Sequence, residues 1–132
     1  MSEKLDVVGI GNAMVDAIIP SSQNEIEKHE INRDSMNLID ETLKNNLHER
    51  YSIKEMAGGG SLGNSMFGIT SFGGNGSFIG KIKNDEVGIF LQKDMVREGL
   101  QFPLGFTSPD ISTGCCTIFV EEDGTRTMCT FL

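Results

Sequence analysis

The residues best suited to chemistry lie in one glycine-rich stretch. Gly58, Gly59 and Gly60 are followed directly by Ser61, and Asn64 comes about one helical turn later. Glycine can adopt positive φ and lets a ligand approach the backbone closely, and serine is a favourable helix N-cap. The stretch therefore predicts a turn into a helix N-cap at Ser61, with free amides for a polar ligand such as phosphate. The alternative is a tight turn between two core elements, which glycines alone favour.

A second candidate is Asp16, the one carboxylate in an apolar, strand-like run over residues 13–19. Aspartate is depleted in strands, so this residue lies either at a sheet edge or in a functional position. The run follows residues 5–10, whose β-branched side chains predict a buried first strand. Glycines at the end of that strand invite comparison with the dinucleotide fingerprint G-x-G-x-x-G. Met14 occupies the third glycine position, however, and no helix is expected there, which excludes a dinucleotide site of this type.

Length and composition restrict the classes of function. A chain of 132 residues suits one domain, and its formal net charge of -8 argues against a nucleic-acid-binding surface. No apolar run is long enough for a membrane span, and the N-terminus lacks the pattern of a signal peptide. The three cysteines have neither disulfide nor zinc spacing. We therefore expect buried thiols in strands of a cytoplasmic protein.

The pattern along the chain predicts alternating strands and helices. Helices are expected at residues 24–31, after an N-cap at Asp40, from Ser61 to about Phe72, and from a cap at Asn84 or Asp85 to a C-terminal Gly99. Strands are expected at residues 77–82, 113–121 and 126–131, the last two joined by a two-residue turn at Asp123-Gly124. Residues 34–38 are expected to form a loop or short strand, and residues 100–106 an irregular segment. This order predicts a parallel α/β core with a small β appendage. His29 and His48 lie on polar helix faces, where we expect them to be solvated.

Four segments, taken together and in order, resemble the ribokinase-like (PfkB) carbohydrate kinases. They are the opening strand and turn at residues 6–16, the G-G-x-x-x-N segment at residues 59–65, the G-x-D-x-x-G stretch at residues 78–88, and the hairpin at residues 113–127. The long segment between Asp16 and Gly58, and the form G-G-S-x-x-N-S, look most like the adenosine kinases and their bacterial relatives. The resemblance covers nearly the whole chain, which makes it more specific than any single glycine motif.

The resemblance implies a fold and an activity. The fold is a doubly wound α/β sheet with a small β lid, and residues 1–132 would be the N-terminal, substrate-binding part of one such domain. Lid strands are expected near residues 13–19, 35–39 and 113–121. The activity is ATP-dependent phosphorylation, with magnesium, of a primary hydroxyl on ribose or a related sugar, and the closest resemblance points to the 5′-hydroxyl of adenosine.

The resemblance also assigns residues to the substrate. Asp16 would accept hydrogen bonds from the secondary hydroxyls of the sugar, and Asn64 would hold a further hydroxyl. Gly59 and Gly60 would allow close backbone approach. Asn12 and Ser61 are also expected to contact the substrate. Four apolar side chains are expected to line the lid: Met36, Leu38, Cys116 and Leu132. The same four side chains would equally serve as lid core.

The chain departs from the family where the chemistry is concentrated. The family's catalytic base lies in a G-A-G-D segment, and N-x-x-E is associated with magnesium; neither motif occurs here, and Walker A is also absent. We therefore expect no catalytic residue and no metal ligand in this chain, with ATP and Mg²⁺ sites in a C-terminal part. Residues 130–132 end within an apolar strand pattern, so the chain is expected to be the first part of a longer protein and inactive alone.

Three alternatives remain open. The first is an adenosine-kinase-like enzyme, and the second is a ribokinase- or fructokinase-like enzyme that acts on a free sugar. The third is a non-catalytic module that binds a sugar or nucleoside, motivated by the missing base. In each case the partner is a small molecule rather than a nucleic acid or membrane, and a homodimer through the lid is the assembly to test.

Overall fold

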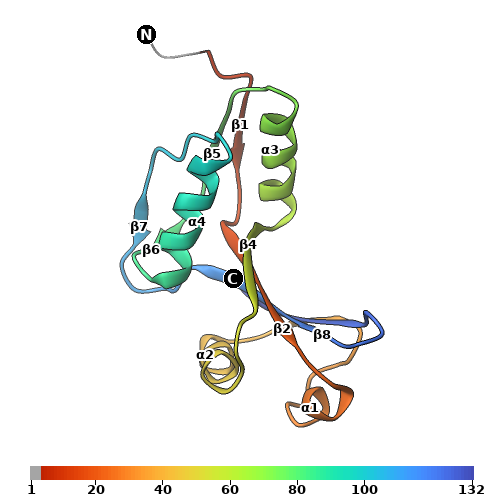
Figure 1. Ribbon diagram of the computed structural model, residues 1–132. Coiled ribbons are helices and arrows are strands. Elements are labelled where there is room, and N and C mark those ends of the chain that lie inside the picture. The colour runs from red at the N-terminus through yellow and green to blue at the C-terminus, as the bar shows by residue number, and fades with distance from the viewer. Residues whose placement is uncertain (1–3) are drawn as a thin grey trace. The chain divides into compact units, whose positions relative to one another are not determined.

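The computed structural model describes residues 4–132, which fall into two compact units (Figure 1). The first unit contains the chain up to Val15 together with Ala57–Gly114, and the second contains Asp16–Met56 and Cys115–Leu132. The boundaries between the units fall inside or beside three strands: β2 (Met14–Pro20), β4 (Glu55–Gly59) and β8 (Gly114–Val120).

The first unit alternates strands with helices. Its elements are β1 (Val7–Ile10), α3 (Ser61–Ser71), β5 (Gly76–Ile79), β6 (Ile82–Lys83), α4 (Glu86–Arg97) and β7 (Phe106–Ser108). β1 pairs with β5 and β6 pairs with β7, both in parallel, as an α/β arrangement requires. Phe78, Leu91 and Met95 are fully buried and belong to the apolar core of this unit.

The local signals at α4 are confirmed, whereas the environment of β1 differs from expectation. The Asp85 carboxylate accepts a hydrogen bond from the Gly88 amide at 2.8 Å, and Gly99 follows the helix with a φ of 86°. The first strand was expected to be buried, but Val8 and Ile10 are 51% and 76% exposed. Within residues 4–132, β1 pairs with β5 alone, so one of its edges is uncovered.

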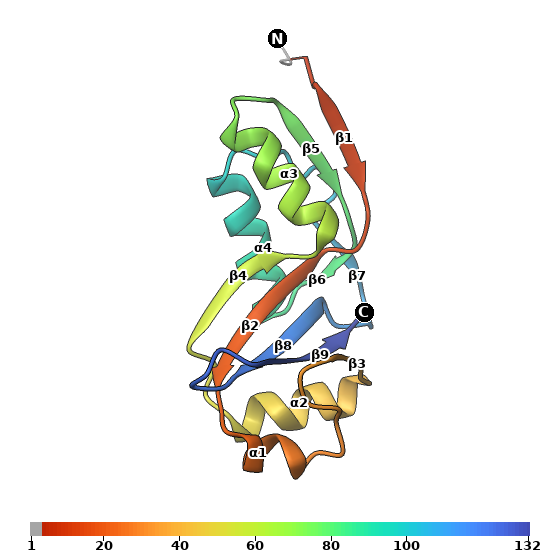
Figure 2. The same cartoon turned by 90° about the vertical axis from the view of Figure 1, so that its right-hand side faces the viewer.

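The second unit is a mixed sheet with two helices on one face. The strand order is β3-β9-β8-β2-β4, with β3 at Met36–Leu38 and β9 at Arg126–Phe131. α1 (Gln23–Glu27) and α2 (Glu41–Arg50) lie on the same side of this sheet (Figure 2). The core beneath the sheet consists of Ile19, Ile26, Leu47, Phe119 and Cys129. All three cysteines are buried and free, as the sequence predicted.

Helix boundaries follow local capping chemistry. Asp40 caps α2 by accepting a hydrogen bond from the Leu43 amide at 2.8 Å, which confirms that prediction. α1 is shorter than the expected helix over residues 24–31, because it ends at Glu27 and the backbone turns to a φ of 54° at Glu30. The N-cap of α3 is Gly60 rather than Ser61, because that position has a φ of 78°. Ser61 is instead the first helical residue.

The strands and their connections differ from the sequence prediction in four places. The strand expected at residues 77–82 is divided into β5 and β6, and the irregular segment leads into β7. The first two glycines of the predicted turn belong to β4. The hairpin loop is longer than two residues, since Glu121 still donates its amide to the Thr125 carbonyl at 3.0 Å. Gly124 closes this loop with a φ of 87°, typical of a three-residue hairpin turn.

Both histidines are less solvated than expected. His29 Nε2 lies 2.7 Å from the Tyr51 hydroxyl, and its ring stacks on Phe119 with centroids 6.5 Å apart. His48 Nε2 lies 2.8 Å from Oγ1 of the fully buried Thr117. Contact with β8 accounts for this difference, because the segment after α1 places His29 against Phe119 and α2 places His48 beside Thr117.

No helix within residues 4–132 combines the length and apolarity needed to cross a membrane.

Candidate functional site

Asp16 lies on the sheet face opposite α1 and α2. In β2 the side chains alternate, so that Val15, Ala17 and Ile19 are buried and Asp16 and Ile18 are half-buried. Ile19 belongs to the core under the two helices. Because successive residues of a strand point to opposite faces, Asp16 points away from that core.

The register of the neighbouring strands places further residues on this face. Cys116 of β8 pairs with Thr130 of β9, which in turn pairs with Leu38 of β3. The Thr130 hydroxyl donates a hydrogen bond to Cys116 Sγ at 3.4 Å, so these two side chains share a face. Paired residues in a sheet present their side chains on the same side, so Leu38 joins the row. Met36 begins the adjacent row.

We call this surface the open face. Its residues come from β2, β3, β8 and β9, and alternation and register define them: Asp16, Ile18, Pro20, Met36, Leu38, Cys116, Ile118, Val120, Arg126, Met128 and Thr130. Met36 and Leu38 are 55% and 71% exposed. The open face is therefore largely apolar, with a carboxylate, a hydroxyl and a thiol among its side chains and the exposed Arg126 guanidinium where β9 begins.

Burial determines the protonation behaviour of the open face. Desolvation raises the pKa of Asp16 above its ordinary value, because a carboxylate in apolar surroundings loses hydration. The pKa of Cys116 is also raised, chiefly by desolvation; the bond from Thr130 opposes this shift and the charge of Asp16 adds to it. The thiol is therefore uncharged at neutral pH and behaves as a small apolar side chain. The carboxylate is the group that can accept hydrogen bonds strongly.

The glycine-rich segment belongs to the first unit, where each glycine has a different constraint. A Cβ at Gly58 would lie 2.7 Å from Asp94 Oδ2 and 2.8 Å from the Phe67 ring. The Gly58 amide donates to the same carboxylate oxygen at 3.0 Å, so Asp94 fixes this part of β4. Gly59 is buried, and Gly60 adopts a φ of 78° that suits glycine.

The N-terminus of α3 begins at these glycines without a side-chain cap. The Gly60 carbonyl accepts the first helical hydrogen bond, from the Asn64 amide at 2.9 Å. The earlier amides of the helix have no intrahelical partner, as at any helix start. Ser61 and Asn64 are exposed beside them. This arrangement offers backbone and side-chain donors to a polar ligand.

The segment before β2 lies next to the start of this helix. A Cβ at Gly11 would come within 2.7 Å of the Leu62 side chain, and one at Gly60 would contact Met14 at 3.6 Å. Asn12 is exposed between these two contacts. The residues predicted from the glycine motif and from the first strand are therefore neighbours in the same unit.

The structure thus separates the residues predicted for the site into two sets. Asn12, Gly59, Gly60, Ser61 and Asn64 belong to the first unit. The second unit contains Asp16, Met36, Leu38 and Cys116, which share the open face, and Leu132, which follows β9 and is 57% exposed. That both sets contact the same ligand stays a prediction from the sequence.

Sequence reasoning missed two residues that the structure makes prominent. Thr130 lies on the open face beside Cys116, and the alternation of β9 could have indicated it. Asp94 holds the Gly58 amide and also contacts Arg97. A carboxylate between the buried Leu91 and Met95 of α4 was the signal for this role.

Comparison with known proteins places this arrangement in context. The model of the pfkB family carbohydrate kinases matches residues 4–132. The structure of an adenosine kinase from Sinorhizobium meliloti is 35% identical, with a TM-score of 0.84, and the match covers 98% of this chain and 40% of that chain. A probable sugar kinase protein from Rhizobium etli CFN 42 is 32% identical, with a TM-score of 0.83 and coverage of 97% and 39%. None of the curated proteins matches the chain.

More distant structures share the fold. Adenosine kinase from Anopheles gambiae, in complex with P1,P4-di(adenosine-5) tetraphosphate, is 23% identical with a TM-score of 0.79, and the match covers 95% of this chain and 38% of that chain. The expected α/β, ribokinase-like fold class is confirmed by these neighbours. The chain spans about 40% of the length of the adenosine kinase from Sinorhizobium meliloti and of the probable sugar kinase from Rhizobium etli CFN 42.

Proposed function

The chain belongs to the pfkB family of carbohydrate kinases, and we propose that it is the acceptor-binding part of a kinase that phosphorylates the 5′-hydroxyl of adenosine. The observation that carries this proposal is the half-buried Asp16 carboxylate among the apolar side chains of the open face. A nucleoside combines two adjacent ribose hydroxyls with a flat, largely apolar base. The open face offers a partner for each of these parts.

Asp16 suits the ribose because its two oxygens can accept hydrogen bonds from a vicinal diol together. Hydrogen bonds to charged groups contribute about 1.5–3 kcal/mol each. Desolvation raises the pKa of Asp16, so its carboxylate gains from ligand donors that replace lost water. In the first unit, the Asn64 side chain and the uncapped N-terminal amides of α3 can donate hydrogen bonds to sugar hydroxyl oxygens.

The apolar residues of the open face favour a nucleoside over a free sugar. Met36 and Leu38 present exposed apolar side chains in rows next to Cys116 and Thr130. Burying such surface against a base yields roughly 25 cal/mol per Å². A free sugar has no apolar face of comparable size. The identity of 35% to an adenosine kinase supports the same choice.

The second candidate is a kinase for a free sugar such as ribose or fructose, favoured by the 32% identity to a probable sugar kinase. A third is non-catalytic binding of the same ligands, motivated by the missing G-A-G-D segment in these residues. Both alternatives use the Asp16 carboxylate. The second differs in its acceptor, a free sugar, and the third in the lack of phosphoryl transfer.

The cofactors implied by the family are ATP and a divalent metal. Within residues 4–132, no group of three or more His, Cys, Asp or Glu side chains is placed to hold a metal ion. The proposal assigns neither a magnesium ligand nor a catalytic base to this part of the chain. Its residues bind and orient the acceptor.

A side-by-side assay tests the proposal. The intact protein, supplied with ATP and Mg²⁺, is assayed with adenosine, ribose and fructose as acceptors. We expect the highest kcat/KM with adenosine. A preference for ribose or fructose would support the second candidate, and binding without phosphoryl transfer to any acceptor would support the third. Two further proposals remain. A cytoplasmic location, which suits three reduced buried thiols, is tested by fractionation, and a homodimer through the lid is tested by sedimentation.

A further inference from the structure

The wall formed by Met36 and Leu38 rests on a very short strand. β3 has three residues and lies at the edge of the sheet beside β9. Two backbone hydrogen bonds flank it: the Met128 amide donates to the Ser35 carbonyl at 2.9 Å, and the Ile39 amide donates to the Thr130 carbonyl at 3.0 Å. Such an exposed edge strand has little stability of its own, so other contacts must fix its position.

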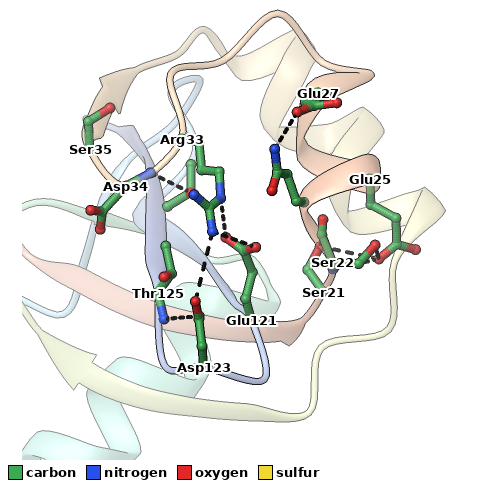
Figure 3. A network of polar contacts seen from close by, with 12 residues as sticks. Ser21, Ser22, Glu25, Glu27, Arg33, Asp34, Ser35, Glu121, Asp123 and Thr125 are labelled. Atoms are coloured by element: carbon green, nitrogen blue, oxygen red, sulfur yellow. Dashed lines mark hydrogen bonds and ion pairs between the residues drawn. The ribbon is translucent and has the colours of Figure 1, made fainter.

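An ion pair outside the open face supplies such a contact. Arg33 Nε donates to Glu121 Oε2 at 2.8 Å, and its Nη2 donates to Glu121 Oε1 at 3.1 Å (Figure 3). Asp123 Oδ2 also lies 4.0 Å from Arg33 Nη2. Arg33 precedes β3 by three positions, whereas Glu121 and Asp123 belong to the β8–β9 hairpin. This two-pronged pair, the Arg33 clamp, joins segments 88 residues apart in sequence.

Burial makes the clamp more than a surface ion pair. The Glu121 side chain is only 8% exposed, whereas the Arg33 side chain is 37% exposed. Glu121 is thus a nearly buried carboxylate that needs a partner, and two parallel hydrogen bonds fix the direction of the guanidinium. Lysine at this position would supply a charge without the planar fork.

Further hydrogen bonds fix the backbone between Arg33 and β3. The Asp34 amide donates to Oγ1 of the fully buried Thr127 at 3.0 Å. The Asn37 side chain donates to the Asn32 and Met128 carbonyls at 3.0 and 3.2 Å and accepts from the Asn32 amide at 2.8 Å. These bonds transmit the position of Arg33 to the strand that carries Met36 and Leu38.

We propose that Arg33 is a positioning residue for the acceptor: through Glu121 it fixes β3, and thereby the apolar wall of the open face. This inference rests on the proposed function, because it assigns the wall to acceptor binding. Loss of the clamp leaves the chemistry intact and loosens one side of the binding surface. We therefore expect loss of the clamp to change the KM for the acceptor rather than kcat.

The test uses the full-length protein, with adenosine as acceptor. The variants are Arg33→Ala, Arg33→Lys, Glu121→Gln and the double variant Arg33→Ala/Glu121→Gln. Arg50→Ala is the matched control, because Arg50 is an exposed arginine of the same unit that lies over the Tyr51 ring, 5.9 Å from its centroid. Hydrogen exchange at the Ile39 amide reports directly on β3 without any ligand.

Coupling through a packed network typically changes binding by about 0.5–2 kcal/mol, so Arg33→Ala is expected to raise the acceptor KM about twofold to thirtyfold. kcat and the KM for ATP stay within about twofold, as for the Arg50 control. Arg33→Lys is intermediate, and the double variant is no worse than Arg33→Ala. Exchange at Ile39 is faster in Arg33→Ala.

Three results would overturn the inference while leaving kinase activity intact: an unchanged acceptor KM in Arg33→Ala, a loss confined to kcat and folded fraction, or effects of Arg33→Ala and Glu121→Gln that multiply in the double variant. Failure of the proposed function is distinct, because the unmodified protein would then phosphorylate no acceptor. In that case faster exchange at Ile39 would leave the clamp as a structural contact and remove its role in positioning an acceptor.

Discussion

Replacing Asp16 by asparagine separates the binding role of the carboxylate from its cost to the fold. In the full-length protein the amide keeps the shape of the side chain, but one acceptor oxygen becomes a donor and the other loses its charge. A hydrogen bond to a charged group is worth about 1.5–3 kcal/mol, and one between neutral groups about 0.5–1.5 kcal/mol. The expected loss for a diol is therefore about 2–4 kcal/mol, or roughly thirtyfold to a thousandfold in acceptor affinity.

Stability should change in the opposite direction. Desolvation raises the pKa of Asp16 in the folded protein above its unfolded value. A raised carboxyl pKa means that the folded state binds the proton more tightly, so this group's contribution is fully present below the unfolded pKa. It is lost as pH rises through the folded pKa. Above the folded pKa the ionised Asp16 therefore destabilises the fold, and asparagine removes that penalty.

The assay combines calorimetry of adenosine binding with thermal unfolding at pH 7. We expect Asp16→Asn to weaken binding by the stated factor and to raise Tm, and we expect the Tm difference to shrink at acidic pH. Ile18→Val, two residues along the same strand face, is the matched control and should keep affinity within a few fold. Unchanged affinity together with a lower Tm would refute both the hydrogen-bonding role and the desolvation argument.

Substitutions test three other features. Gly60→Ala places a Cβ at a φ of 78° and should cost about 1–3 kcal/mol of unfolding free energy in urea titration. Gly63→Ala, in α3 with open space around the new Cβ, should instead stabilise the protein by about 0.5–1 kcal/mol. Equal effects of the two substitutions would contradict the role of φ. Asn64→Ala should weaken acceptor binding about threefold to tenfold by calorimetry, and equal affinity would remove Asn64 from the site. Desolvation and the charges of Arg50 and Lys28 lower the pKa of His29, and the charge of Glu25 opposes this shift. The stabilising contribution of His29 is therefore present above its unfolded pKa and is lost as pH falls through the lower folded pKa. His29→Asn should flatten that part of the urea-midpoint profile, and an unchanged slope would exclude His29 as its source.

Elements with local chemical signals could be predicted from the sequence. Asp40 and Asp85 cap the helices that follow them, and Gly99 ends α4, because capping depends on residues within one turn. The Gly60 cap escaped prediction for a related reason. Both Gly60 and Ser61 suit an N-cap by residue type, and only the backbone conformation decides between them.

Features that depend on long-range register could not be predicted in the same way. Nothing within residues 34–38 indicates that they pair in parallel with β9, or that Leu38, Thr130 and Cys116 form one row. The Arg33 clamp likewise joins residues 88 positions apart. The histidines were misjudged because helical periodicity does not reveal which buried hydroxyl will lie opposite a polar side chain.

The position of Asp16 within β2 explains why this carboxylate, among the many acidic residues of the chain, is the strongest candidate. A shift by one residue would place it at Val15 or Ala17, on the buried face of the strand, where an unpaired charge is very costly. At position 16 it is half-buried on the open face, so desolvation raises its pKa while its oxygens stay accessible to a ligand. A site that only needed solubility would have placed the carboxylate at a fully exposed position. The cost in stability is thus the physical reason to assign Asp16 to binding, and the opposite signs expected for affinity and Tm in Asp16→Asn follow from that single placement.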